Sequence, residues 1–202
     1  NTDGFYSYTI QIEDLTGTTT ETGFDVTVNA GTPIEAELTT TLLLNQAGDP
    51  GHGALDLDEG LEAGVSTDGA TTKEQTEIRD MGLDCTIPAP GLNWRRQIAS
   101  TNGAELRKVD LSAVENFTFD GVTTKEEIIG AFETGFTLAD GEAVNCGNGT
   151  TTTATNVSDV VTADELFVVK NSAGTRYYLL KVISVNETDM DNEDWYEISV
   201  KY

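Results

Sequence analysis

The stretch 166-LFVVKNSAGTRYYLLKVISVNETDMDNEDWYEISVKY-202 carries the strongest structural signal in the chain. Residues 166–170 are a short apolar run, and the following Asn-Ser-Ala-Gly supplies turn residues, including a glycine free to adopt positive φ. Residues 176–185 place apolar side chains on both faces of an extended strand, which we therefore expect to be central in its sheet. Residues 195–202 alternate apolar and polar side chains. Together they predict a C-terminal three-stranded antiparallel meander.

Extended segments also dominate the first half of the chain. Residues 5–13 alternate with a period of two, which predicts a half-buried strand. Its apolar face comprises Tyr6, Tyr8, Ile10 and Ile12. Further extended segments are expected at residues 23–29, 34–44 and 78–85, and residues 54–60 predict a short strand that ends in a turn. Runs of threonine favour strands in the same way.

Two short helices and one loop complete the expected elements. Thr71 followed by Glu74 fits a capping box and predicts a short helix there. Residues 123–134 predict the stronger helix, and Gly135 can end it. Either of two pairs can cap its start, Thr124 with Glu127 or Thr123 with Glu126. The polar, Gly- and Thr-rich residues 140–155 predict a mobile loop.

We therefore expect a mainly β protein of antiparallel sheets, sandwich-like, with one or two short helices and the C-terminal meander. Residues 1–52 form an N-terminal β segment, and residues 53–202 form a β domain. The sequence leaves open whether the N-terminal segment is a separate small sandwich or extends the same sheet.

The charge of the chain restricts its partners. The 202 residues include 11 Lys and Arg against 35 Asp and Glu, a formal net charge of −24. Residues 1–72 contain 13 acidic side chains and no basic one. Nucleic acids and anionic lipids are bound through Lys and Arg, so both are excluded as expected partners. Such a surface is typical of a secreted or salt-adapted protein.

Two cysteines, Cys85 and Cys146, lie in polar, turn-like surroundings. A disulfide between them would close a loop of about 60 residues and stabilise the fold by about 4 kcal/mol on the chain-entropy model. The alternative is two free thiols. The acidic, Thr-rich composition favours the disulfide and an extracytoplasmic location.

The sequence holds no pattern typical of an enzyme. It lacks the serine-hydrolase elbow, the zinc-protease helix motif, C-x-x-C, the P-loop and the dinucleotide-binding glycine motif. A catalytic cysteine would need a histidine partner, and the chain has only His52. We therefore expect a non-enzymatic protein without a resident cofactor.

Calcium is the one metal ion that the residues suggest. Asp189, Asp191, Glu193 and Asp194, with Asn192, form an oxygen-rich cluster. An EF-hand would need Gly and Glu where the chain has Asp194 and Val200, so the alternatives are an irregular Ca²⁺ site and a solvated acidic loop. Asp56, Asp58 and Glu59 form a second, weaker cluster.

Two further groups of side chains allow alternative interpretations. His52, Met81 and Met190 could serve as axial haem ligands, or as ordinary loop and core residues. The basic residues Arg95, Arg96, Arg107 and Lys108 indicate either local charge balance on an acidic protein or a small anion-binding patch.

Several motifs in residues 53–202 resemble a surface-lipoprotein domain of Bacteroidetes. They are residues 53–60 (GALDLDEG), 77–80 (EIRD), 93–95 (NWR), the helix after Phe119-Asp120 and the ending from Asp164 to Val200-Lys201. The broader architecture is similar to the HmuY-type haem-binding lipoproteins, which hold iron between two His or two Met. This chain has one His and two Met 109 positions apart, so no haem ligand is carried over. The resemblance implies an outer-membrane or surface anchor through a lipidated cysteine upstream of Asn1.

The expected function is that of a cell-surface or exported binding or accessory protein, associated with an outer-membrane nutrient-uptake complex or a surface assembly. Its partners would be outer-membrane or surface proteins, or further copies of itself. Two alternatives remain: a haem- or porphyrin-capturing lipoprotein, and a structural subunit of a surface fibre or layer, in which strands of residues 1–44 pair with neighbouring chains.

Overall fold

The computed structural model describes residues 4–28, 30–44, 53–57, 76–88, 93–188 and 193–202. It divides the chain into two compact units, Asn1–Thr32 and Pro33–Tyr202. The mainly β fold class is confirmed, with one helix among the described residues. The boundary of the larger unit lies within the segment 1–52, because residues 33–44 belong to the larger unit.

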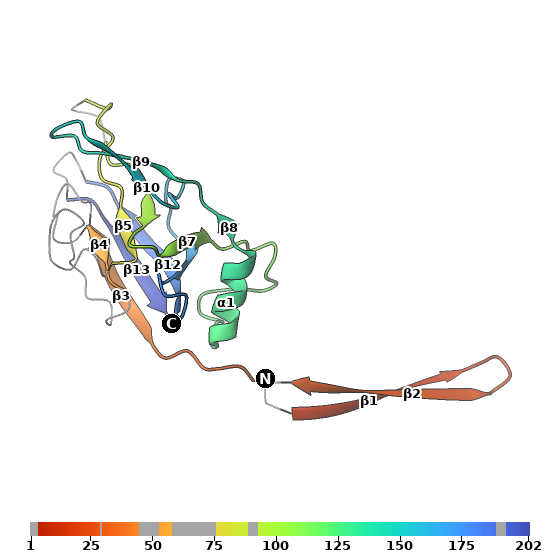
Figure 1. Cartoon of the computed structure of the whole chain (residues 1–202). Coiled ribbons are helices and arrows are strands. Elements are labelled where there is room, and N and C mark those ends of the chain that lie inside the picture. The colour runs from red at the N-terminus through yellow and green to blue at the C-terminus, as the bar shows by residue number, and fades with distance from the viewer. Residues whose placement is uncertain (1–3, 29, 45–52, 58–75, 89–92, 189–192) are drawn as a thin grey trace. The chain divides into compact units, whose positions relative to one another are not determined.

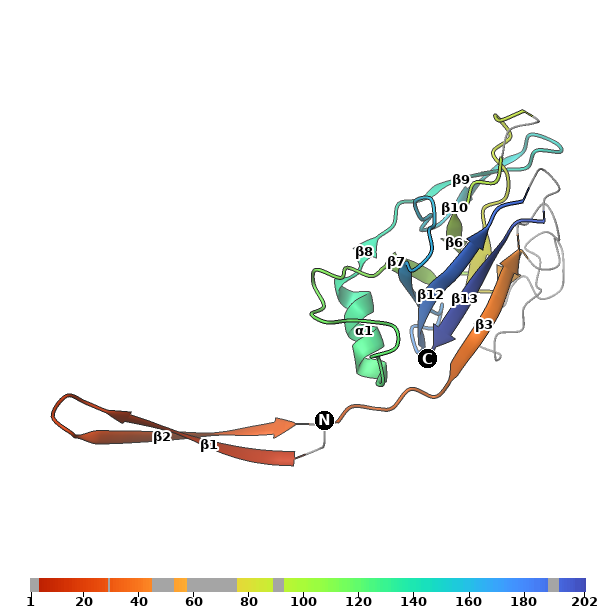
Figure 2. The same cartoon turned by 180° about the vertical axis from the view of Figure 1, so that it is seen from behind.

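The larger unit is built on a six-stranded antiparallel sheet (Figure 1). Its strands, in spatial order, are β3 (Glu37–Leu44), β13 (Trp195–Lys201), β12 (Tyr177–Asn186), β11 (Leu166–Lys170), β7 (Glu105–Lys108) and β8 (Phe136–Thr137). The predicted meander is confirmed as β11, β12 and β13, and β12 has a partner on each side. Figure 2 shows β12, β13 and β3 side by side in this sheet.

Both faces of this sheet are covered, which accounts for the apolar side chains on both faces of β12. A three-stranded sheet of β4 (Ala54–Leu55), β5 (Ile78–Asp80) and β6 (Ile98–Ser100) contributes to the main core on one face. Tyr178 and Leu180 of β12 point into that core. On the other face, Leu179 packs with Ile128 and Phe132 of helix α1 (Lys125–Thr134).

Helix α1 starts at the capping box that the sequence predicts. The Thr124 hydroxyl accepts a hydrogen bond from the Glu127 amide, and the Glu127 carboxylate accepts one from the Thr124 amide at 2.9 Å. The helix ends at Thr134, with Gly135 as its C-cap. The second expected helix, near Thr71 and Glu74, falls outside the described residues.

Two expectations about individual segments are wrong. Residues 140–155 are not a loop: β9 (Gly141–Val144) and β10 (Thr151–Ala154) form a hairpin, because Ala143 and Ala154 pack against Met81 and Ala99. The strand expected at 78–85 ends at Asp80, where the chain turns. The short strand predicted within 54–60 is present as β4, Ala54–Leu55.

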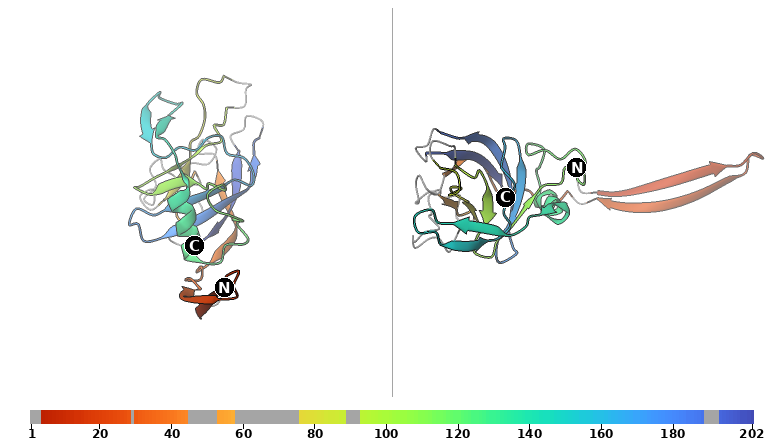
Figure 3. Two further views of the ribbon diagram at one scale, coloured as in Figure 1. Left: turned by 90° about the vertical axis from the view of Figure 1, so that its right-hand side faces the viewer. Right: turned by 90° about the horizontal axis from the view of Figure 1, so that it is seen from above.

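The smaller unit is a β-hairpin of β1 (Gly4–Glu13) and β2 (Thr19–Val28), a long twisted ribbon (Figure 3). Both predicted strands are present, and β2 begins at Thr19, earlier than the predicted start at Gly23. The expected burial of one face is wrong, since Tyr8 is 51% and Ile12 62% exposed. The hairpin has two strands and no second layer in its own unit, so neither face is covered there.

Loss of the cap should destabilise the larger unit. Thr124→Ala removes the hydroxyl that satisfies a first-turn amide, and we expect the free energy of unfolding to fall by about 1 kcal/mol in urea titrations. Thr134→Ala, at the other end of the helix, is the control and should change it by less than about 0.5 kcal/mol. Equal effects of the two substitutions would contradict the cap.

The cap also predicts a pH dependence. Burial raises the pKa of Glu127, but hydrogen bonds from Thr123 and Thr124 outweigh it and lower the pKa below the ordinary value of 4.5. A lowered folded-state pKa gives stability that is present above 4.5 and is lost as the pH falls through the folded-state pKa. The destabilisation caused by Glu127→Gln should therefore shrink on acidification.

Candidate functional site

A cleft of about 370 Å³ lies between the chain that leaves β5 and the β9–β10 hairpin. One side is lined by Arg79, Met81, Gly82 and Leu83, and the other by residues of the hairpin and its turn. Its apolar lining is Met81, Leu83, Ala143 and Val144, and its polar lining includes Asn145, Asn148, Thr150, Thr152 and Arg79. Both sides of the cleft belong to the larger unit.

The first side of the cleft is shaped by a turn directly after β5. The Asp80 carboxylate accepts a hydrogen bond from the Gly82 amide at 2.6 Å, and Gly82 has a φ of 70°, a conformation that glycine adopts without strain. The chain then pairs with a later segment, through a bridge between Leu83 and Trp94. The Arg95 amide donates to the Gly82 carbonyl at 3.0 Å.

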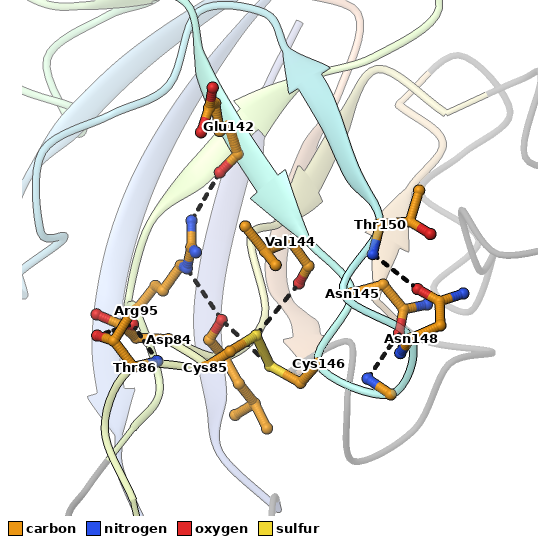
Figure 4. Close-up of a disulfide and its surroundings, with 12 residues drawn as sticks. Asp84, Cys85, Thr86, Arg95, Glu142, Val144, Asn145, Cys146, Asn148 and Thr150 are labelled. Atoms are coloured by element: carbon orange, nitrogen blue, oxygen red, sulfur yellow. Dashed lines mark hydrogen bonds between the residues drawn. A yellow bond between two sulfur atoms is a disulfide. The ribbon is translucent and has the colours of Figure 1, made fainter.

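The disulfide between Cys85 and Cys146 joins the two sides, as predicted, with a Cα–Cα distance of 5.3 Å (Figure 4). Its sulfurs approach two carbonyl oxygens, Cys85 Sγ that of Val144 at 3.7 Å and Cys146 Sγ that of Leu83 at 3.9 Å. These are contacts only, because a disulfide sulfur has no proton to donate. The bond holds the turn of the β9–β10 hairpin against the chain that follows Leu83.

Arg95 makes a second link between the same two sides. Its Nε donates to the Leu83 carbonyl at 3.0 Å, and its Nη1 donates to the Glu142 carbonyl of β9 at 2.7 Å (Figure 4). Asp84 lies beside it: hydrogen bonds from the Thr86 hydroxyl and amide lower the pKa of Asp84, and Arg95 adds to that effect. The negative charge of Asp84 is therefore stabilised next to the guanidinium.

The turn between β9 and β10 is fixed by its own asparagines. The Asn145 side-chain oxygen accepts hydrogen bonds from the amides of Gly147 at 2.8 Å and Asn148 at 3.3 Å. The Asn148 side-chain oxygen accepts one from the Thr150 amide at 2.9 Å. From their polarity, the sequence analysis predicted that these residues belong to a mobile loop. Asparagines that hydrogen-bond nearby amides are, however, typical of tight turns.

The lining of the cleft is mixed in chemistry. Amide and hydroxyl groups alternate with apolar side chains, and the one cationic lining residue is Arg79. None of the described lining residues is acidic, and the lining cysteine, Cys146, is bonded to Cys85 and has no thiolate to offer. The lining therefore offers a ligand both hydrogen-bonding groups and apolar contacts.

Asp80 is a buried carboxylate that sequence reasoning missed. It is fully buried and accepts a hydrogen bond from Trp94 Nε1 at 2.9 Å, so it orients that ring against Tyr196, whose centroid is 4.6 Å away. Burial, and then the Asp80 charge, raise the pKa of Tyr196 well above its ordinary value. No local sequence signal marks Asp80 among 35 acidic residues.

The predicted calcium ligands are only partly described. Asp189 and Asp191 fall outside the described residues, Glu193 is exposed, and Asp194 is buried and accepts a hydrogen bond from the Thr188 amide at 2.7 Å. In the part of the chain that the structure describes, no three His, Cys, Asp or Glu side chains lie together as a metal site. Of the second cluster, Asp56 is buried, and Asp58 and Glu59 are not among the described residues.

Met81 is the one haem candidate that the structure describes. It is 3% exposed, packs with Ala99 and Ala154, and also lines the cleft. His52 and Met190 are outside the described ranges.

The four basic residues of the predicted cluster all have partners. Arg95 donates to the two carbonyls described above. The other three form ion pairs: Arg96 with Glu187, Arg107 with Glu105, and Lys108 with Glu165. Arg96, Arg107 and Lys108 are thus paired with carboxylates, as local charge balance predicts, whereas Arg95 is bonded to backbone carbonyls.

Comparison of the chain with protein-family models, with curated proteins and with solved structures finds no match. No helix in the described ranges is long and apolar enough to cross a membrane.

The disulfide should contribute strongly to the free energy of unfolding. The bond spans 61 positions, so the loop-entropy model predicts that replacing both Cys85 and Cys146 by Ser lowers the free energy of unfolding by about 4 kcal/mol. Urea titrations of the two proteins measure the difference. A reducing agent should lower the stability of the native chain and leave the double variant unchanged. A difference below about 1 kcal/mol would contradict the prediction.

Proposed function

We propose that the protein is a non-enzymatic, extracytoplasmic accessory protein that joins a surface assembly through its N-terminal hairpin. An outer-membrane nutrient-uptake complex is one such assembly, and a surface fibre or layer is another. The observation that carries the proposal is the hairpin itself, which has an exposed, uncharged apolar face.

The extracytoplasmic location is supported by the disulfide. Structural disulfides persist in oxidising compartments and are rare in the cytosol. Cys85 and Cys146 are also the only cysteines in the chain, so no thiol is left for metal binding or redox chemistry. The net charge of −24 fits an exposed, soluble surface.

The assembly role is supported by the two faces of the hairpin. The register pairs Tyr6 with Val26 and Tyr8 with Phe24, so these side chains share one face, where the Tyr8 and Phe24 rings stack at 5.4 Å. We call this the apolar face: Tyr6, Tyr8, Ile10, Ile12, Phe24 and Val26. A two-stranded hairpin is at best marginally stable alone in water, and exposed apolar surface of this kind marks interaction sites.

The larger unit begins in contacts that do not need the hairpin. The amides of Ile34 and Glu35 donate to the carbonyls of Thr123 at 3.1 Å and Tyr202 at 2.5 Å. The Glu35 carboxylate forms an ion pair with Lys125 at 2.5 Å. These contacts fix the chain at the start of the larger unit, so we expect this unit to fold without residues 1–32.

Deletion of residues 1–32 tests the proposal. The full chain and the deletion variant, each tagged at the C-terminus, are extracted gently from the native envelope and sized. The full chain should run as part of a larger complex, and the deletion variant as a free, folded unit with an unchanged unfolding midpoint. Identical complexes for the two proteins would refute the role of the hairpin.

Capture of a haem-like molecule is a second candidate function, favoured by the position of Met81 in the lining of the cleft. It predicts a Soret shift when hemin is added to the purified chain, and loss of that shift in Met81→Ala. Leu83→Ala, which changes the same lining without removing a sulfur ligand, is the control. No shift at micromolar hemin would eliminate this candidate.

A further inference from the structure

We propose that the partner of the apolar face is the same face of a second copy of this chain, so that two hairpins pack face to face into a four-stranded, two-layer sandwich. This inference rests on the proposed function, because it names the partner of the hairpin. The surface that carries it is exposed along both strands: Tyr8 by 51%, Ile10 by 48% and Phe24 by 49%.

The distribution of charge favours a second copy. Every acidic residue of the two described strands lies on the face opposite the apolar face: Glu13, Glu21 and Asp25. Hydrogen bonds hold two of these carboxylates there, from the Ser7 hydroxyl to Asp25 at 2.7 Å and from the Gln11 amide to Glu21 at 3.1 Å. Two copies that pack through their apolar faces therefore bury no carboxylate, although each chain carries a net charge of −24.

The same distribution argues against other occupants. A basic partner would be recognised through acidic side chains, and the apolar face has none between residues 4 and 28. A lipid surface is bound through Lys, Arg and interfacial Trp, whereas residues 1–32 contain five acidic residues and none of these three types. The apolar face therefore packs best against another uncharged apolar surface. The same face of a second copy provides such a surface.

The geometry of a twisted ribbon suits this packing. Two sheets of the same right-handed twist stack about 10 Å apart, with their inner side chains interdigitated. Each strand has ten residues, so a ribbon is roughly 33 Å long, and covering one face of two ribbons removes on the order of 1,000 Å² of surface. That area is near the lower limit for a specific interface, which predicts a reversible dimer that forms with rising concentration.

The effect of salt on the dimer distinguishes packing through apolar faces from an interface held by opposite charges. The two chains of a dimer repel each other through their net charges, and salt screens that repulsion. Sedimentation equilibrium of the purified full chain should therefore show a monomer–dimer equilibrium that shifts towards dimer between low salt and roughly 1 M salt. An interface held by opposite charges would shift in the other direction.

Matched substitutions test the face. Ile10→Glu places a charge in the centre of the apolar face and should weaken the dimer at least tenfold. Phe5→Glu makes the same kind of change on the opposite face, where Phe5 is already 68% exposed, and should leave the dimer constant within about twofold. Tyr8→Thr keeps strand propensity and removes a ring, so it should weaken the dimer even if Ile10→Glu disorders the hairpin.

Each outcome separates this inference from the proposed function. A purified chain that stays monomeric at every concentration and salt level overturns the second copy as partner, and the function stands if the native complex still depends on residues 1–32. Equal weakening by Phe5→Glu and Ile10→Glu overturns the face-to-face arrangement. A dimer that survives deletion of residues 1–32 places the interface on the larger unit and overturns the inference.

Discussion

The central strand β12 imposes the constraint on which the larger unit depends. Its side chains are apolar on both faces, so the sheet that contains it must be covered twice. The β4–β5–β6 sheet covers Tyr178 and Leu180, and helix α1 covers Leu179. The layers of the fold follow from this one strand, because each layer is present where an apolar face of β12 would otherwise meet water.

The hairpin of residues 4–28 also has an apolar face, but its own unit contains no second layer to cover that face. Its apolar face has aromatic and aliphatic side chains at regular spacing, as a core-facing strand does, yet these side chains are exposed. The alternation of apolar and polar side chains shows that one face of a strand is apolar. It does not show whether other residues cover that face. The sequence therefore predicted both strands of the hairpin and wrongly predicted their burial.

Other outcomes have similar causes. The meander and the helix cap at Thr124 were predictable because local residue types determine them, and the disulfide because the chain has only two cysteines. The β9–β10 hairpin was not, since its stability comes from Ala143 and Ala154 packing against distant residues and from the link to Cys85. The burial of Asp80 was likewise invisible, because it depends on Trp94, fourteen positions away, as a hydrogen-bond donor. Tertiary partners decide such sites.

The negative net charge limits where parts of this chain can make close contacts. A chain with a net charge of −24 must form its close contacts where carboxylates are absent or paired. Within the larger unit, the disulfide and the Arg95 hydrogen bonds to carbonyls join the sides of the cleft without bringing two acids together. The hairpin keeps its strand carboxylates on one face and leaves the other uncharged. Because of that separation, two acidic chains can pack through this face without bringing carboxylates together.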